Sequence, residues 1–294
     1  MDSTDNAGET RTEHEQTRRH GDEGLEELQA EAPDQEVAGH GTEAMPRPPL
    51  PKGPVLVVAA HPDDPEFGCG GAMAALLAAG RQVVVAVVTD GTEGGEDPSV
   101  PDHELRDLRE EEQRAASAAL GNIELEFMRF PDGRLQPTLE LRRAIATLIR
   151  RYRPATIFTH DPTSFIGAGY INHPDHRATG QATLDAIFPA AGNPRSFREL
   201  LAEGLQPHKI NSIYLFYTPG ADAWIDISEV IERKVASLRC HRSQIGKPEE
   251  LDQRVREWAQ KTGETAKLPA AEGFRHIVLR PDEEEPKQQE EQAE

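Results

Sequence analysis

Residues 55–66 read Val-Leu-Val-Val-Ala-Ala-His-Pro-Asp-Asp-Pro-Glu. The apolar run at 55–60 predicts a strand buried on both faces, because a strand with one face in water alternates apolar and polar side chains. The polar residues that follow predict a loop at the carboxyl end of this strand. A second run, Val-Val-Val-Ala-Val-Val at 83–88, predicts another strand of the same kind. Strands of this kind are typical of a parallel sheet covered by helices, so an α/β fold is expected.

Strand patterns and helix patterns alternate through the rest of the central region. This alternation predicts a mostly parallel sheet with helices on both faces, for which 3-2-1-4-5 is a common strand order. Ligands bind such a sheet where the winding direction reverses, which here lies between the first and fourth strands. The expected strands are 55–60, 82–89, 123–130, 155–159, 209–217 and one near 274–279, and the expected helices are 70–80, 104–120, 139–152, 174–188, 228–242 and 248–262.

The chain has 294 residues and a net charge of -20, and most of this charge lies at its two ends. Residues 1–50 carry 13 acidic and 4 basic residues, and residues 282–294 carry 7 acidic residues and 1 basic residue. Neither segment can bury enough apolar surface to offset its chain entropy. We therefore expect a disordered acidic tail with a Pro-rich linker at 1–53, one folded domain at 54–281, and a second disordered acidic tail at 282–294.

The composition excludes several classes of protein. An acidic chain lacks the basic face that binds nucleic acid phosphates. Two cysteines exclude a disulfide framework and a four-cysteine zinc site. No apolar run reaches the roughly 18 residues of a membrane span, and the first residues lack a secretory signal pattern. A cytoplasmic protein without nucleic acid or membrane partners is expected, and a homo-oligomer stays open.

Two clusters of histidine and aspartate follow the first and fourth strands of the expected sheet. The first is His-Pro-Asp-Asp at 61–64, and the second is His-Pro-Asp-His at 173–176. The expected topology brings both clusters to the crevice between these strands. Because zinc takes nitrogen and oxygen ligands, and catalytic zinc has three protein ligands, His61, Asp64 and His176 form a candidate ligand set.

Each cluster also has an ordinary structural explanation. Asp63 and Asp64 beside a proline can form a loop or cap a helix, and residues 173–176 can cap the helix that follows. The side chains of the two adjacent aspartates diverge, so one can bind a metal while the other faces a bound water. The spacing leaves open which aspartate does which. The metal site is favoured because both clusters lie at strand-to-loop junctions that the topology places side by side.

The chain resembles the PIG-L (LmbE-like) deacetylases over roughly residues 54–245. The specific motifs are Ala-His-Pro-Asp-Asp at 60–64 and Asn-His-Pro-Asp-His at 172–176. Weaker motifs lie at 68–71, 88–91, 130–133 and 241–244. The resemblance implies a Rossmann-like three-layer sandwich and zinc-dependent hydrolysis of the N-acetyl group of an N-acetylglucosamine-type amino-sugar conjugate. In some relatives a glutamate directly follows the two aspartates, whereas Pro65 intervenes here and leaves the role of Glu66 open.

The resemblance also implies a role for each residue of the two clusters. The implied metal ligands are His61, Asp64 and His176. Asp63 is the implied general base for a water molecule activated by the metal. His173 is the implied stabiliser of the oxyanion, and Asp175 is the partner that orients its ring. Zn²⁺ is the expected ion, and another divalent ion such as Fe²⁺ stays open.

Two more residues are candidates for contacts with the substrate. Positions similar to Arg109 and Asp132 contact sugar hydroxyls in the family. The alternative for Arg109 is an exposed helix ion pair with its acidic neighbours. The alternative for Asp132 is a turn with Gly133. The roles of His160 and Tyr170 are left open.

Other functions compete with the deacetylase. The nearest is a metal-dependent amidase that acts on a different sugar or thiol conjugate, and only substrate loops such as 91–103 and 163–172 would distinguish it. The fold alone would also suit a dinucleotide-binding oxidoreductase, but the Gly-x-Gly-x-x-Gly pattern is missing after the first strand. A non-catalytic protein recruited through its acidic tails is disfavoured by the intact candidate ligands and base.

Overall fold

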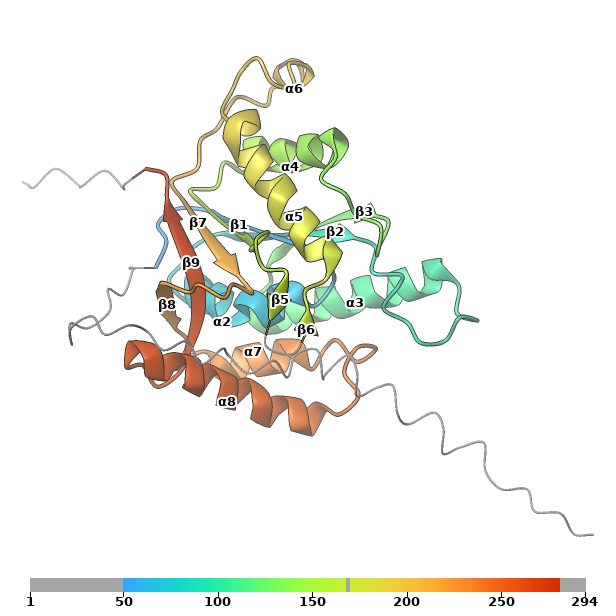
Figure 1. The fold of residues 1–294 in the computed structure, drawn as a ribbon, viewed down its shortest axis with the longest axis vertical. Coiled ribbons are helices and arrows are strands. Elements are labelled where there is room, and N and C mark those ends of the chain that lie inside the picture. The colour runs from blue at the N-terminus through green and yellow to red at the C-terminus, as the bar shows by residue number, and fades with distance from the viewer. Residues whose placement is uncertain (1–49, 168–169, 281–294) are drawn as a thin grey trace, which may run out of the picture.

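The middle layer of the protein is a seven-stranded sheet (Figure 1). The structure is a computed structural model, and it describes residues 50–167 and 170–280. Its strands are β1 (Val55–Ala59), β2 (Val83–Thr89), β3 (Glu124–Phe130), β4 (Thr156–His160), β7 (Ser212–Phe216), β8 (Ala223–Asp226) and β9 (Ala271–Val278). They are arranged in the order β3-β2-β1-β4-β7-β9-β8. The strands from β3 to β7 in this order pair in parallel.

The expected α/β fold is confirmed, and the expected order 3-2-1-4-5 holds for the parallel part, in which β7 is the fifth expected strand. The sheet continues beyond that strand. β9 pairs antiparallel with β7, and β8 pairs antiparallel with β9. β8 was not expected, because a strand of 4 residues carries too little periodicity to be recognised.

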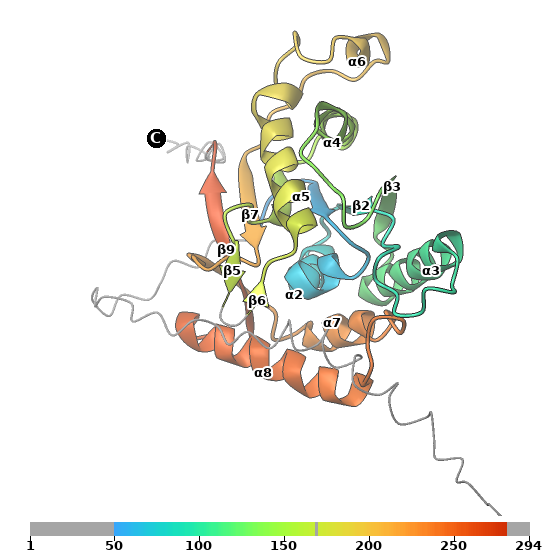
Figure 2. The same ribbon diagram turned by 45° about the vertical axis from the view of Figure 1, so that its right-hand side comes forward.

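Helices cover both faces of the sheet (Figures 1 and 2). One face carries α4 (Leu139–Tyr152) and α5 (Pro174–Asp185), and the other carries α2 (Asp64–Ala78) and α3 (Asp102–Leu120). α7 (Ile231–Leu238) packs against α2 and α3, and α8 (Pro248–Ala266) packs against α7 and β9. The short α6 (Glu199–Ala202) lies apart from the sheet. None of the helices in the described ranges is long and apolar enough to cross a membrane.

The apolar runs of the strands supply the core on both sides of the sheet. In β1, Val55 and Val57 belong to the apolar cluster on the α2 side, whereas Leu56 and Val58 belong to the cluster on the α4 and α5 side. All of these side chains are at most 1% exposed. The continuous apolar pattern therefore has its physical origin in burial of both sheet faces.

Some helices differ from their expected bounds. α2 begins at Asp64, earlier than the expected residue 70, because Pro65 is tolerated in a first helical turn. Its backbone leaves the helical conformation once, at Cys69, where φ is -151° and ψ is 24°. The helix expected over 174–188 is regular only up to Asp185, where α5 ends. A π-helical segment (Ala186–Ala191) follows it directly. The loop after β4 also contains a small hairpin of β5 (Ile166–Gly167) and β6 (Tyr170–Ile171).

The predicted tails fall almost wholly outside the described residues. Of the segment assigned to the linker, residues 50–53 are described, and Leu50 packs against the apolar core. Pro51 is buried. The described part of the domain therefore begins a few residues before the expected boundary at 54.

The close approach of α5 to the end of β4 depends on Gly180. A Cβ atom at this position would lie 2.4 Å from the carbonyl oxygen of His160 and 3.1 Å from Cδ of Pro162. Alanine is favoured over glycine inside a helix by up to ~1 kcal/mol. Here the contact with a fixed backbone atom outweighs that preference.

We expect Gly180→Ala to lower the free energy of unfolding by about 1–3 kcal/mol, as other overpacked cores do. Urea denaturation measures this change. Gly220→Ala is the matched control, because a Cβ at Gly220 would meet no atom within 4 Å. Equal or greater stability of Gly180→Ala would contradict the packing argument.

Candidate active site

Neighbouring strands bring the two histidine clusters together. β1 and β4 pair in parallel with Val58 beside Thr159, so the loop that starts at His61 leaves the sheet next to the end of β4. α5 starts at Pro174 and carries the second cluster over the same edge (Figure 2). The rings of His61 and His176 lie with their centroids 5.2 Å apart.

The candidate metal ligands converge on Asp64. Its Oδ2 lies 3.2 Å from Nδ1 of His61, and its Oδ1 lies 3.1 Å from Nε2 of His176. One donor atom from each of these residues lies within 4.8 Å of the others. Two imidazoles and one carboxylate at this spacing fit a divalent ion that prefers nitrogen and oxygen ligands and keeps a position open for water or substrate.

The carboxylate of Asp64 is buried, and its negative charge is stabilised by neighbouring groups. Burial opposes ionisation, but the imidazole of His176 opposes this effect most strongly, and the pKa of Asp64 lies well below its ordinary value. The backbone N–H of His61 also donates to Oδ2 of Asp64 at 2.8 Å. Asp64 is therefore held as a carboxylate, the form that binds a cation.

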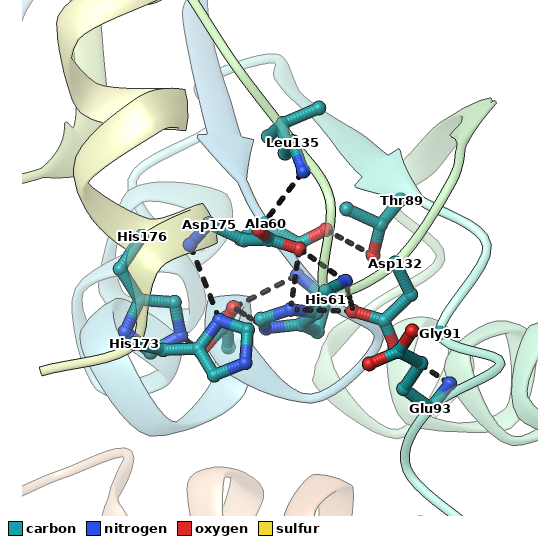
Figure 3. A network of polar contacts seen from close by, with 12 residues as sticks. Ala60, His61, Thr89, Gly91, Glu93, Asp132, Leu135, His173, Asp175 and His176 are labelled. Atoms are coloured by element: carbon teal, nitrogen blue, oxygen red, sulfur yellow. Dashed lines mark hydrogen bonds and ion pairs between the residues drawn. The ribbon is translucent and has the colours of Figure 1, made fainter.

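The second ring nitrogen of His61 faces two carboxylates (Figure 3). Its Nε2 lies 3.0 Å from Oδ1 of Asp132 and 3.5 Å from Oδ2 of Asp175. Burial alone would lower the pKa of His61, but hydrogen bonds with Asp132, Asp175 and Asp64 raise it well above the ordinary value. The contact with Asp132 suits a metal ligand, because a carboxylate keeps one proton on Nε2, and loss of the other proton on metal binding would leave Nδ1 to the ion.

Asp132 thus has a position that sequence reasoning did not anticipate. Its carboxylate faces His61, and it also accepts hydrogen bonds from the backbone N–H groups of Glu93 at 3.0 Å and Gly133 at 2.8 Å. Burial opposes its ionisation, and the contact with His61 lowers its pKa well below the ordinary value. Asp132 therefore forms the turn contact with Gly133 that was one alternative, and it also contacts the candidate metal ligand His61.

Asp63 and Asp64 face different partners, as their adjacency predicts. The carboxylate of Asp63 accepts a hydrogen bond from Nη2 of Arg109 at 3.2 Å. Its backbone has a φ of 110°, a strained conformation for a residue other than glycine. The N–H of Asp63 donates to Oε1 of Gln113 at 3.1 Å, which helps to hold this conformation. Burial raises the pKa of Asp63 despite the opposing guanidinium of Arg109.

Arg109 is a buried residue of the site. Its side chain donates to the carbonyl oxygens of Gly91 and Pro62, each at 2.8 Å, and to Asp63. The alternative interpretation of Arg109 as an exposed helix ion pair is wrong, because only 3% of the residue is exposed. It ties the loops after β1 and β2 together, and a contact with a sugar hydroxyl stays a prediction.

His173 and Asp175 contact each other differently from what the resemblance implies. The backbone N–H of Asp175 donates to Nδ1 of His173 at 3.2 Å, as an N-terminal cap of α5. The carboxylate of Asp175 instead accepts the N–H groups of Gly133 at 2.8 Å and Leu135 at 3.1 Å. Burial lowers the pKa of His173, and the imidazole of His61 lowers it further. His173 is therefore neutral, and its orientation comes from the helix cap.

His160 belongs to the site, although its role was left open. It is fully buried at the end of β4, and its Nε2 accepts the N–H of Ala60 at 3.0 Å. Its ring stacks on that of His176 with centroids 4.2 Å apart. Burial lowers the pKa of His160 to about 3, and the nearby imidazole of His176 contributes. A neutral His160 thus contacts both clusters, through the N–H of Ala60 beside the first and through the ring of His176 in the second. Tyr170 pairs with Gly167 across the small hairpin.

Glu66 joins a buried polar network next to Asp63. Its Oε1 accepts Nε2 of Gln113 at 2.8 Å, and its Oε2 lies 3.2 Å from Nε2 of His241. Burial opposes the charge on His241, but the contact with Glu66 raises its pKa. Sequence reasoning missed this network because Glu66 and His241 are 175 residues apart and no local pattern links them.

The structure brings all candidate site residues into one site around His61 and Asp63. These residues are His61, Asp63, Asp64, Arg109, Asp132, His173, Asp175 and His176. The site thus holds two imidazoles and a carboxylate that could bind a metal ion, beside a carboxylate on a strained backbone, at the carboxyl ends of a parallel sheet.

Comparison with known proteins gives the family. A family model for GlcNAc-PI de-N-acetylase (PIG-L) matches residues 56–187. The diacetylchitobiose deacetylase of Thermococcus kodakarensis is 37% identical over 197 residues, which cover 67% of this chain and 71% of that protein. The chain belongs to the PIG-L family and is a deacetylase, a hydrolase that acts on amide bonds.

Two further comparisons agree with this assignment. A 1D-myo-inositol 2-acetamido-2-deoxy-alpha-D-glucopyranoside deacetylase of Mycobacterium sp. (strain KMS) is 30% identical over 232 residues, covering 65% of this chain and 74% of that protein. The solved structure of N,N'-diacetylchitobiose deacetylase from Pyrococcus horikoshii is similar with a TM-score of 0.71 and 30% identity, covering 78% of this chain and 86% of that one.

The contact between His61 and Asp132 yields a prediction. We expect Asp132→Asn to weaken zinc binding by roughly 10-fold or more, because outer partners of a ligating histidine typically contribute that much. Competition against a chelator of known affinity measures the dissociation constant. Asp97→Asn, at an exposed acidic residue, is the control. If Asp132 served sugar binding alone, the variant would bind zinc like the natural protein and show only a raised KM.

Proposed function

We propose that this protein is a metal-dependent N-deacetylase that hydrolyses the N-acetyl group of an N-acetylglucosamine conjugate. The observation that supports this most is the convergence of His61, Asp64 and His176 beside the carboxylate of Asp63. Zn²⁺ suits two imidazoles and a carboxylate, and Fe²⁺ is the alternative ion.

Asp63 is the residue that activates water in the proposed mechanism. His61, Asp64 and His176 would hold a divalent ion, which would supply Lewis acidity to the acetyl carbonyl and to water. Asp63 accepts the proton from the attacking water as the general base. Arg109 holds the Asp63 carboxylate in place through Nη2, at 3.2 Å. Burial of Asp63 makes its proton affinity higher than that of an exposed aspartate.

His173 stabilises the negative charge that develops on the acetyl oxygen. Its Nδ1 accepts the N–H of Asp175, so the neutral ring carries its proton on Nε2 and can donate from that atom. A preorganised donor of this kind contributes roughly 2.7–4 kcal/mol to the transition state. Asp63 then gives its proton to the leaving amine, and acetate and a free amine are released.

The names of the relatives support the proposed substrate class. They are named for diacetylchitobiose and for an inositol conjugate of acetamido-deoxy-glucose. An N-acetylglucosamine unit attached to a second group is common to both names, and we infer that this chain accepts such a unit. A metal-dependent amidase of another sugar or thiol conjugate is the remaining alternative, because its machinery would be the same.

Release of acetate tests the proposed function. The purified protein is incubated with diacetylchitobiose and with other N-acetylglucosamine conjugates, before and after metal removal by a chelator. We expect acetate release that is lost on chelation and restored by added Zn²⁺. Activity that persists without any divalent ion would contradict the metal-dependent mechanism, and activity on other acyl amides alone would favour the amidase.

The general base is tested by Asp63→Asn. We expect this variant to bind Zn²⁺ within a few-fold of the natural protein but to lose about 10²–10⁴-fold in kcat, because the amide cannot accept the proton. His176→Ala is the contrasting variant, since it removes a ligand and is expected to lose both zinc binding and turnover. Normal turnover by Asp63→Asn would refute the assignment of the base.

A further inference from the structure

The break in α2 exposes backbone groups that a continuous helix would satisfy. The chain leaves the helical conformation at Cys69. In general, the first N–H groups of a helical segment have no acceptor within that segment. The last carbonyl oxygens of a helical segment likewise have no donor within it. Buried backbone groups of this kind need other partners, because an unpaired one costs roughly 1–3 kcal/mol.

A buried ion pair from two distant elements supplies these partners. Glu272 in β9 accepts the N–H of Gly71 at Oε1 and that of Ala72 at Oε2, each at 2.8 Å. Lys234 in α7 donates from Nζ to the carbonyl oxygen of Phe67 at 2.8 Å. The two side chains contact each other, with Nζ 2.6 Å from Oε1. Opposite charges thus cap the two helix ends that meet at the break.

The first segment of α2 carries the functional residues of this helix. It begins at Asp64 and includes Glu66, which contacts Gln113 and His241. The direction of this segment relative to the rest of α2 is set at the break. A change in the break therefore moves Asp64 relative to His176, which lies on α5.

Glycines at the break leave little room for another arrangement. A Cβ at Gly68 would lie 2.6 Å from the ring of Phe216 in β7, and a Cβ at Gly71 would lie 2.6 Å from the side chain of Ile227. The backbone on both sides of Cys69 is thus packed directly against its neighbours. The motif Gly-Cys-Gly-Gly at 68–71 is explained by this packing.

We propose that Lys234 and Glu272 are positioning residues for the metal site, which hold the break in α2 and thereby place Asp64 for ion binding. This inference rests on the proposed metal-dependent function. Both side chains are at most 8% exposed. A buried ion pair is often no more stabilising than apolar residues of the same size, so stability alone does not account for it. What the pair adds is a set of directed hydrogen bonds that an apolar pair lacks.

Zinc affinity of the full-length protein tests the proposal. The variants are Glu272→Gln, which keeps the size but removes the charge, and the double variant Lys234→Met with Glu272→Leu, which avoids an unpaired buried charge. The control is Arg239→Met with Asp252→Asn, which removes an ion pair between α7 and α8 away from the break. Competition against a chelator gives the dissociation constant, and the absorption spectrum of bound Co²⁺ reports the ligand geometry.

We expect both test variants to bind zinc about 10-fold or more weakly and to change the Co²⁺ spectrum, while the control keeps the affinity and the spectrum of the natural protein. If Glu272→Gln does not fold, the double variant decides. A purely structural pair would lower the unfolding midpoint and leave both metal readouts unchanged, which would overturn the proposal. Failure of the natural protein to bind a divalent ion would overturn the proposed function and this inference together, whereas unchanged variants overturn the inference alone.

Discussion

The parallel pairing of β1 with β4 is the contact on which the site depends. It sets Val58 beside Thr159, so the loop after β1 and the segment after β4 emerge at the same edge of the sheet. Asp64 and His176 then meet at 3.1 Å although they come from different helices. Both strands are fully buried, and a slip of one residue would move each side chain to the opposite face of the sheet, where it would meet different helices and have to repack.

The site concentrates carboxylates that would repel one another without fixed partners. Asp132 and Asp175 are stabilised by backbone N–H groups of the loop between β3 and α4. Asp64 is stabilised by imidazoles, and Asp63 by the guanidinium of Arg109. Each of these buried carboxylates therefore has a fixed polar partner. The proposed divalent cation would add its positive charge to an arrangement of carboxylates that is already fixed.

The C-terminal part of the chain supports the site from outside the segment that the family model matches. That model covers residues 56–187, whereas His241, Lys234 and Glu272 come later in the sequence. His241 completes the polar network of Glu66, and the ion pair of Lys234 and Glu272 caps the break in α2. α7 and β9 therefore act on the site through α2, the helix that carries Asp64.

The sequence by itself determined the parallel sheet, its order in the central part and the two motifs that meet at its edge. It could do so because burial of both sheet faces leaves continuous apolar runs, and because the motifs are local. Only the tertiary structure decided the partners of the side chains. Arg109 contacts Asp63 across 46 residues of sequence, and Glu66 contacts His241 across 175. Asp132 likewise contacts His61, and Asp175 accepts the N–H of Gly133. Contacts of this range are set by how the helices pack on the sheet, and no local pattern encodes that packing.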